Sequence, residues 1–118
     1  MAEGTGVVGH LEAALRAAGV RQAIIANNIA NLGTPGYRRR EVPFEQVFAE
    51  ALDAGKPVDQ AELLARIVEP RTGPLNEQGN DVELDAEVGD LVKNSMMYKT
   101  YMRLLGRVYR QMEIAIQG

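Results

Sequence analysis

Apolar side chains recur at alternating gaps of three and four residues in two stretches of the chain, one near each end. This heptad spacing keeps one narrow stripe of a helix facing a partner helix. The first stripe reads Val8, Leu11, Leu15, Ala18, Gln22, Ile25, Ile29 and Leu32. The second stripe reads Leu84, Val88, Leu91, Ser95, Tyr98, Met102, Leu105, Tyr109, Met112 and Ile116. We therefore expect a mainly α fold in which two long terminal helices pack as an antiparallel, coiled-coil-like pair.

Cap signals give the approximate bounds of these two helices. The first is expected over Val7–Leu32, because Gly33 offers a C-terminal cap and a Thr-Pro-Gly turn follows. The second is expected over Asp81–Ile116, with Asn80 and Glu83 in the spacing of a capping box. At 1.5 Å per residue the second helix spans about 54 Å and the first about 39 Å. Part of the second stripe is therefore expected to extend past the first helix.

The segment between the two helices contains all five prolines. Helical spacing of apolar residues predicts a short amphipathic helix over Pro43–Ala54, with the proline at its start. Ala61–Glu69 fits either a helical turn or a strand, and Arg71–Gly79 fits a loop. The chain thus divides into the N-terminal helix of an assembly domain, a Pro/Gly-rich middle segment and the C-terminal helix of the assembly domain, at residues 1–32, 33–80 and 81–118.

Two polar residues interrupt the apolar stripes and suggest a register for the helix pair. If Gln22 lies opposite Ser95, an antiparallel arrangement brings Leu11 near Leu105 and Leu32 near Leu84. Buried polar residues that meet can fix the register of a helix pair at some cost in stability.

Composition limits the function classes without naming one. The 118 residues are 46% hydrophobic and 25% charged, with a net charge of −3, which does not favour nucleic acid or an anionic membrane as a partner. No transmembrane segment or cleaved secretory signal is expected, and the absence of cysteine excludes disulfides and thiolate metal sites. Because two helices cannot enclose a core alone, we expect the chain to complete its core by assembly.

No group of residues predicts catalysis, a cofactor or a metal site. His10, the one histidine, is expected to be a solvated surface residue. The acids Asp81, Glu83, Asp85 and Glu87 alternate along a helix and so spread around it, where capping and the helix dipole explain them. The stretch Asn76–Asp81 lacks the ligand pattern of a calcium loop and fits a turn. The sequence therefore does not predict an enzyme.

Two further groups of residues are interpreted as contact surfaces. Arg38–Arg40 is the one basic run, and we expect it to pair with an acidic surface on a neighbouring protein rather than with nucleic acid. A small nucleic-acid binder that uses these arginines is an alternative function that the sequence favours less. The methionines and tyrosines of the second helix are expected to be packing residues, at Met97, Tyr98, Tyr101, Met102, Tyr109 and Met112.

Asparagines are unusually dense at the end of the first helix, although they are poor helix formers. The stretch is Asn27, Asn28, Ile29, Ala30, Asn31, Leu32, Gly33, Thr34, Pro35, Gly36 and Tyr37, followed by the arginines. It resembles the signature of the flagellar rod and hook family of axial proteins. The C-terminal helix adds matches at Gly79–Leu84, Asn94-Ser95, Tyr98, Leu104–Gly106 and Ile116–Gly118.

The resemblance implies a structural subunit of the bacterial flagellar basal body, in the periplasmic rod. Such subunits are not enzymes, are exported without a cleaved signal by the flagellar type III apparatus, and polymerise through their terminal helices around the export channel. The implied partners are further copies of the chain, the proximal rod protein FlgC, the distal rod proteins, and FliE at the basal ring. The motif Asn27–Tyr37 would lie in contacts between subunits, and residues 38–78 would shape the outer surface. Two alternatives stay open: FlgC itself, and a soluble helical adaptor unrelated to flagella.

Overall fold

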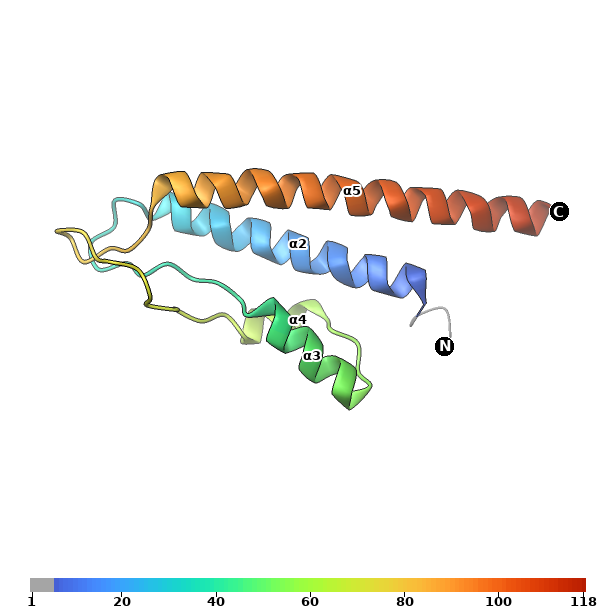
Figure 1. Cartoon of the computed structure of the whole chain (residues 1–118), viewed down its shortest axis with the longest axis horizontal. Helices are drawn as coiled ribbons and strands as arrows, with labels where there is room; N and C mark the ends of the chain where they lie inside the picture. The colour runs from blue at the N-terminus through green and yellow to red at the C-terminus, as the bar shows by residue number, and fades with distance from the viewer. Residues whose placement is uncertain (1–5) are drawn as a thin grey trace.

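The computed structural model describes residues 6–118 and contains four helices in that range, two long and two short. They are α2 (Val7–Ala30), α3 (Phe44–Ala54), α4 (Gln60–Ala65) and α5 (Leu84–Gln117). The chain is elongated, with principal extents of 64 × 29 × 17 Å. α2 and α5 run antiparallel side by side, and α3 and α4 lie on the other side of α2 (Figure 1). The expected mainly α fold with a pair of long terminal helices is confirmed.

The register proposed from the polar stripe positions is also correct. Gln22 donates a hydrogen bond from Nε2 to Oγ of Ser95 at 3.3 Å. Near the other end of the pair, the Tyr109 hydroxyl donates to Oε2 of Glu12 at 3.4 Å. Beyond that contact α5 continues past the start of α2, as the difference in helix length requires (Figure 1).

The face of α5 that packs on α2 differs from the apolar stripe. The fully buried residues of α5 are polar, namely Glu87 and Asn94. Leu91, Ser95 and Leu105 of the expected stripe are half-buried. Its other members are between 40% and 85% exposed, and we call them the exposed α5 stripe: Leu84, Val88, Tyr98, Met102, Tyr109, Met112 and Ile116. The expected packing of the second stripe against the first is therefore only partial.

A small apolar core lies between α2 and the middle segment. The sequence pattern did not predict this core. It consists of Val20, Ile24, Val42, Phe44, Val47, Val58 and Leu63. Leu63, in the segment Ala61–Glu69 that fitted two structures, is fully buried on α4. The same segment also contains an extended residue, because Val68 forms an antiparallel bridge with Glu41. Both interpretations of that segment are thus partly right.

Local signals explain the ends of the short helices. α3 begins one residue after Pro43 and ends at Gly55, whose φ of 66° is the left-handed conformation that glycine adopts most readily. The Asp59 side chain caps α4 by accepting a hydrogen bond from the Glu62 backbone N–H at 2.8 Å. The structure confirms the short helix predicted over Pro43–Ala54 and the loop predicted over residues 71–79.

Two cap predictions for the long helices are wrong. α2 ends at Ala30, and Gly33 does not have a positive φ, because Asn31 terminates the helix instead. The Asn31 side chain donates to the Asn27 carbonyl at 2.8 Å and so satisfies a carbonyl of the last turn. α5 begins at Leu84 without a side-chain cap, because the Asn80 side chain bonds to a different part of the chain.

Candidate functional site

The motif after α2 folds into a tight turn held by its own polar groups. The Thr34 hydroxyl donates to Oδ1 of Asn31 at 3.1 Å, and the Tyr37 N–H donates to the Thr34 carbonyl at 3.2 Å. Gly36 has a φ of 76°, a conformation that costs an L-residue roughly 1–2 kcal/mol. The glycine is therefore needed for its backbone conformation.

This turn packs against the loop that leads into α5. The Gly36 N–H donates to the Gln78 carbonyl at 2.8 Å. Gly79 also has a positive φ, 74°, and a Cβ placed on it would lie 3.8 Å from Cα of Gly36. Two glycine turns, far apart in the sequence, thus meet backbone to backbone.

Asn80 joins these two segments with a single side-chain amide. Its Nδ2 lies within 3.2 Å of three backbone carbonyl oxygens, those of Asn31, Leu32 and Thr34. Its Oδ1 accepts from the Val82 N–H at 2.7 Å. Because Asn80 is 1% exposed, these bonds replace the water that would otherwise satisfy the end of α2.

Asn28 makes the most complete set of hydrogen bonds in the motif, and it is fully buried. Its Nδ2 donates to Oε1 of Glu87 at 2.9 Å and to the Arg40 carbonyl at 3.0 Å. Its Oδ1 accepts from the Tyr37 hydroxyl at 2.9 Å and from the Arg40 N–H at 3.0 Å. Both donors and both acceptor positions of the amide are therefore used inside the chain.

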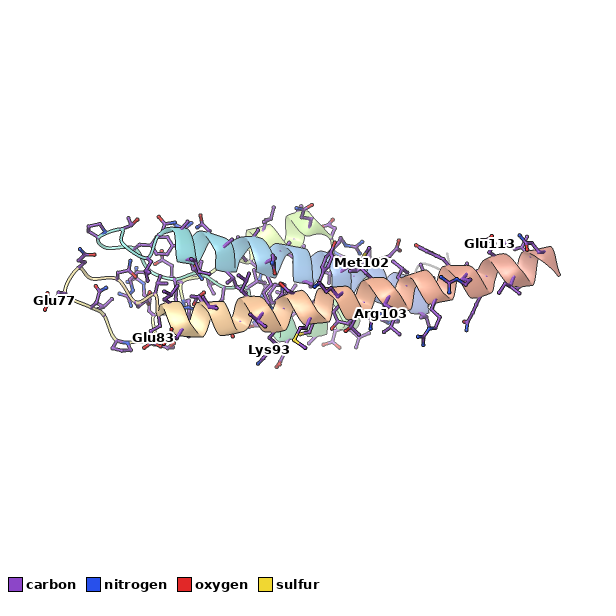
Figure 2. The ribbon with its side chains drawn as sticks, turned by 90° about the horizontal axis from the view of Figure 1, so that it is seen from above. Glu77, Glu83, Lys93, Met102, Arg103 and Glu113 are labelled. Atoms are coloured by element: carbon purple, nitrogen blue, oxygen red, sulfur yellow. The ribbon has the colours of Figure 1, made fainter. Side chains whose placement is uncertain are left out.

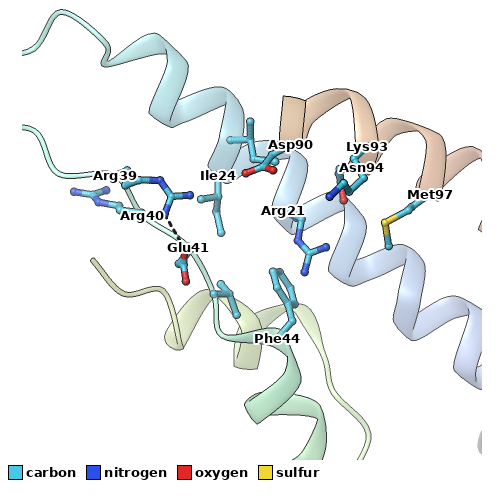
Figure 3. Close-up of a pocket in the computed structure, with 12 residues that line it drawn as sticks. Arg21, Ile24, Arg39, Arg40, Glu41, Phe44, Asp90, Lys93, Asn94 and Met97 are labelled. Carbon is cyan, nitrogen blue, oxygen red and sulfur yellow. Dashed lines mark hydrogen bonds and ion pairs between the residues drawn. The ribbon is translucent and has the colours of Figure 1, made fainter. Parts of the chain in front are cut away.

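Two arginines of the basic run pair with buried acids near the start of α5. Nε of Arg38 lies 3.2 Å from Oδ2 of Asp81, and Nε of Arg39 lies 2.9 Å from Oε2 of Glu87. Arg39 also reaches Glu41 at 2.8 Å (Figure 3). Burial by itself lowers the pKa of the Arg39 guanidinium, but its bonds to Glu41 and Glu87 outweigh burial and raise that pKa above its usual value.

These pairs correct two expectations. Capping and the helix dipole do not explain Asp81 and Glu87, because both carboxylates are buried and form ion pairs with arginines. Arg38 and Arg39 are not an exposed surface for a neighbour, although Arg40 is exposed and lies over the Tyr37 ring at 5.6 Å. We call the whole cluster the polar junction, and it comprises Asn28, Arg38, Arg39, Asn80, Asp81 and Glu87.

The other motif residues divide by exposure. Asn27, Ala30, Thr34, Pro35 and Gly36 are exposed, whereas Ile29, Asn31 and Tyr37 are half-buried. Asn27 makes one side-chain hydrogen bond, from Nδ2 to the Tyr37 hydroxyl at 3.1 Å. The motif thus has an inner part that positions the chain and an outer part that lies on the surface.

Apolar side chains are exposed along the length of α5. In addition to the exposed α5 stripe, Val92, Met96 and Ile114 are 55–65% exposed. Met102 and Glu113 mark the middle and the far end of the helix, and the part around Glu113 extends past α2 (Figure 2). An apolar surface of this length is typical of an interaction site.

A groove runs along α2 and is flanked by α5 and α3. It consists of two adjoining hollows of about 290 and 340 Å³. Arg21, Phe44, Asn94 and Met97 line both hollows, and Figure 3 shows them around the first. Asn94 donates to the Ala18 carbonyl and to Oε1 of Gln22, both at 2.8 Å. Its Oδ1 is buried and has no hydrogen-bond partner among the residues that the structure describes.

Within residues 6–118 no three His, Asp or Glu side chains are grouped to hold a metal ion. His10 is exposed, and its Nδ1 lies 2.7 Å from the Gly6 carbonyl oxygen. The loop at Asn76 is an Asx turn, in which its Oδ1 accepts from the backbone of Gln78 and Asn80. None of the described helices is long and apolar enough to cross a membrane.

Comparison with known proteins points to one family. Residues 10–38 match the model of the flagella basal body rod protein family. The chain is 32% identical to flagellar basal body rod protein FlgB of Cereibacter sphaeroides over 83% of this chain and 84% of that protein. It is 28% identical to FlgB of Bacillus subtilis over 97% and 95% of the two chains. It is 27% identical to FlgB of Escherichia coli over 83% and 84%.

Proposed function

Because the chain belongs to the FlgB family of flagellar basal body rod proteins, we propose that α2 and α5 carry the contacts that build it into the rod. As a member of this family the chain is a structural subunit of the flagellar basal body rod and not an enzyme. The family assembles with other rod components, so each subunit needs surfaces that neighbouring subunits can cover.

The observation that carries the proposal is the exposed α5 stripe. Its members are 40–85% exposed and recur over nearly the whole helix. Burying apolar surface contributes roughly 25 cal/mol per Å², so a neighbouring helix laid along the stripe would be bound favourably. Among residues 6–118, no helix lies beside the part of α5 that extends beyond α2 (Figure 1).

The outer half of the motif is assigned to subunit contacts, and its inner half to positioning. Asn27, Ala30, Thr34 and Pro35 are exposed and available to a neighbour. Asn28 instead fixes the end of α2 against α5 from inside the chain. The middle segment, residues 38–78, forms the outer surface that distinguishes this subunit from others in the rod.

The specific partners follow from the family and are part of the proposal. They are further copies of this chain, FlgC, the distal rod proteins, FliE at the basal ring, and the type III export apparatus during export without a cleaved signal. The two alternatives, FlgC itself and an adaptor unrelated to flagella, are not favoured, because the relatives are FlgB proteins. A nucleic-acid binder is disfavoured because Arg38 and Arg39 pair with acids of the same chain.

The test places a charge on the exposed α5 stripe. Met102 is 50% exposed, so Met102→Glu should change the free energy of unfolding of the single chain by less than about 0.5 kcal/mol. In a strain that carries only this variant, rod assembly and swimming should be lost at normal expression. Thr100→Glu is the matched control, because Thr100 is exposed, lies two residues away on the other side of α5, and should leave swimming intact.

Normal swimming with Met102→Glu would contradict an assembly role for this stripe. Equal loss of swimming with Thr100→Glu would show that any added charge on α5 is harmful, and would remove the support for a specific face. Circular dichroism of both purified variants checks that the single chain remains folded.

A further inference from the structure

The groove between α5 and α3 has an apolar floor of small side chains. Ala13, Ala14, Ala17 and Ala18 of α2 line it, with Phe48 of α3 and Tyr101 of α5 on its sides. Alanines allow another backbone to come close, as larger side chains would not. From His10 to Arg21 this floor is about 17 Å long at 1.5 Å per residue.

The free end of α5 matches this groove in length and character. Met112 and Ile116 are 45% and 85% exposed and continue the face of the half-buried Leu105 beyond Tyr109, whose hydroxyl still bonds to Glu12 of α2. Along α5 these four residues are spaced four, three and four apart, so they share one side of the helix. Residues 110–117 span about 12 Å, within the length of the alanine floor.

The charges of the two surfaces are complementary. The first hollow is lined by more cations than carboxylates: Arg21, Arg39, Arg40 and Lys93 against Glu41 and Asp90. Arg21 stacks on the Phe44 ring at 4.3 Å, and neither Arg21 nor Lys93 forms an ion pair within the part of the chain that the structure describes. Figure 3 shows both at the first hollow. On the free end of α5, Glu113 is exposed (Figure 2). Helical spacing places Glu113 beside Met112 and Ile116, and places Arg110 farther round the helix from them. A carboxylate beside an apolar helix face is the group that these two cations would bind.

We propose that the groove between α5 and α3 binds the free end of α5, residues 110–117, from a second copy of this chain. The contact is head-to-tail, so each copy offers a groove to one neighbour and a helix end to another. Such a contact does not close on itself in pairs and builds a ring or a filament. The inference rests on the proposed function and adds which surface meets which.

Introduced cysteines test this contact directly, because the chain has none of its own. Ala14→Cys places a thiol on the groove floor, and Met112→Cys places one on the helix end. Mixed at high concentration under mild oxidation, the two variants should form a disulfide-linked dimer at least about tenfold faster than the control pair, since docking raises the effective thiol concentration. The control pair uses Ala23→Cys with Met112→Cys, because Ala23 is also an alanine, is exposed and lies on the opposite side of α2 from Ala14.

Each outcome of the cross-linking experiment decides the proposal. Faster linkage of the Ala14–Met112 pair supports it. Equal linkage of both pairs, no linkage, or preferred linkage of Met112→Cys to itself overturns it, the last because it indicates a two-fold symmetric contact.

A second variant separates this proposal from the proposed function. Ala14→Arg fills the groove and should reduce sedimenting assemblies of the full chain, as Met102→Glu should. Normal assembly with Ala14→Arg and loss with Met102→Glu would refute the groove and leave the exposed α5 stripe as the assembly surface. Normal assembly with both variants would refute both.

Discussion

Replacing Asn28 by alanine should destabilise the single chain more than an alanine at any other position of the motif. The four hydrogen bonds of its amide are 2.9–3.0 Å long and lie inside the chain, where the side chain is 0% exposed. A typical hydrogen bond contributes about 1 kcal/mol net, and a bond to a charged group more. Since one of the four partners is the buried Glu87 carboxylate, we expect a loss of about 3–5 kcal/mol.

This loss is a large fraction of the free energy of unfolding of a small domain, which is about 5–15 kcal/mol. Urea unfolding followed by circular dichroism at 222 nm measures it. With a slope of about 2 kcal/mol per M, a loss of 4 kcal/mol lowers the midpoint by about 2 M. Asn28→Asp keeps the size and the acceptor oxygen, removes both donors, and adds a carboxylate that faces Glu87. It should be at least as destabilising at neutral pH.

Asn27→Ala is the matched control for both variants. Asn27 is the preceding asparagine, is exposed, and makes one side-chain hydrogen bond at 3.1 Å. Its replacement should cost less than about 1 kcal/mol. If Asn28→Ala costs no more than Asn27→Ala, Asn28 does not hold α2 to α5 in the way described.

Three further predictions test the turn, the core and the far end of the helix pair. Gly36→Val should lower the free energy of unfolding by about 1–3 kcal/mol because φ is 76°, whereas Gly36→Asn should cost less; equal costs in chemical unfolding would contradict a requirement for positive φ. Leu63→Ala should cost about 2–5 kcal/mol because Leu63 is 0% exposed, while Leu64→Ala, at 50% exposure, should cost far less in the same assay. Desolvation and then the charge of Glu12 raise the pKa of Tyr109, so Glu12→Gln should move its ultraviolet titration to lower pH, and an unchanged titration would contradict the contact between them.

Much of the helical framework could be predicted because its signals are local. Spacing of three and four predicted both long helices, Pro43 marked the start of the short one, and Gln22 and Ser95 gave the register. Each signal depends on residues within a few turns of one another, or on one pair of polar residues in otherwise apolar stripes.

The polar junction could not be predicted in the same way, because its partners are distant in the sequence. Asn28 and Glu87 are 59 residues apart, and Arg38 and Asp81 are 43 apart. Considered locally, the acids fit the start of a helix and the arginines fit an exposed turn. The available signal was the coincidence of three adjacent arginines with acids near the start of the second helix, once the antiparallel register is assumed.

The buried side of α5 was missed for a related reason. Glu87 and Asn94 are its most buried residues, so a search for apolar side chains selects a neighbouring stripe instead. Polar residues can line a helix contact when their hydrogen bonds are made inside it. Glu87 fulfils this condition fully, and Asn94 fulfils it except at Oδ1.

The polar contact face of α5 and its exposed apolar stripe have a consequence for assembly. Sliding α5 along α2 by one turn would break the contacts of Asn28 with Glu87, Gln22 with Ser95 and Asn94 with Ala18 together. An apolar contact of equal area could shift at lower cost, since hydrophobic attraction is not directional. Polar contacts inside the chain thus fix the register of the helix pair, and the exposed α5 stripe remains accessible to a neighbour. Every copy then presents the exposed α5 stripe at the same position relative to its middle segment, which identical subunits need in order to form identical contacts.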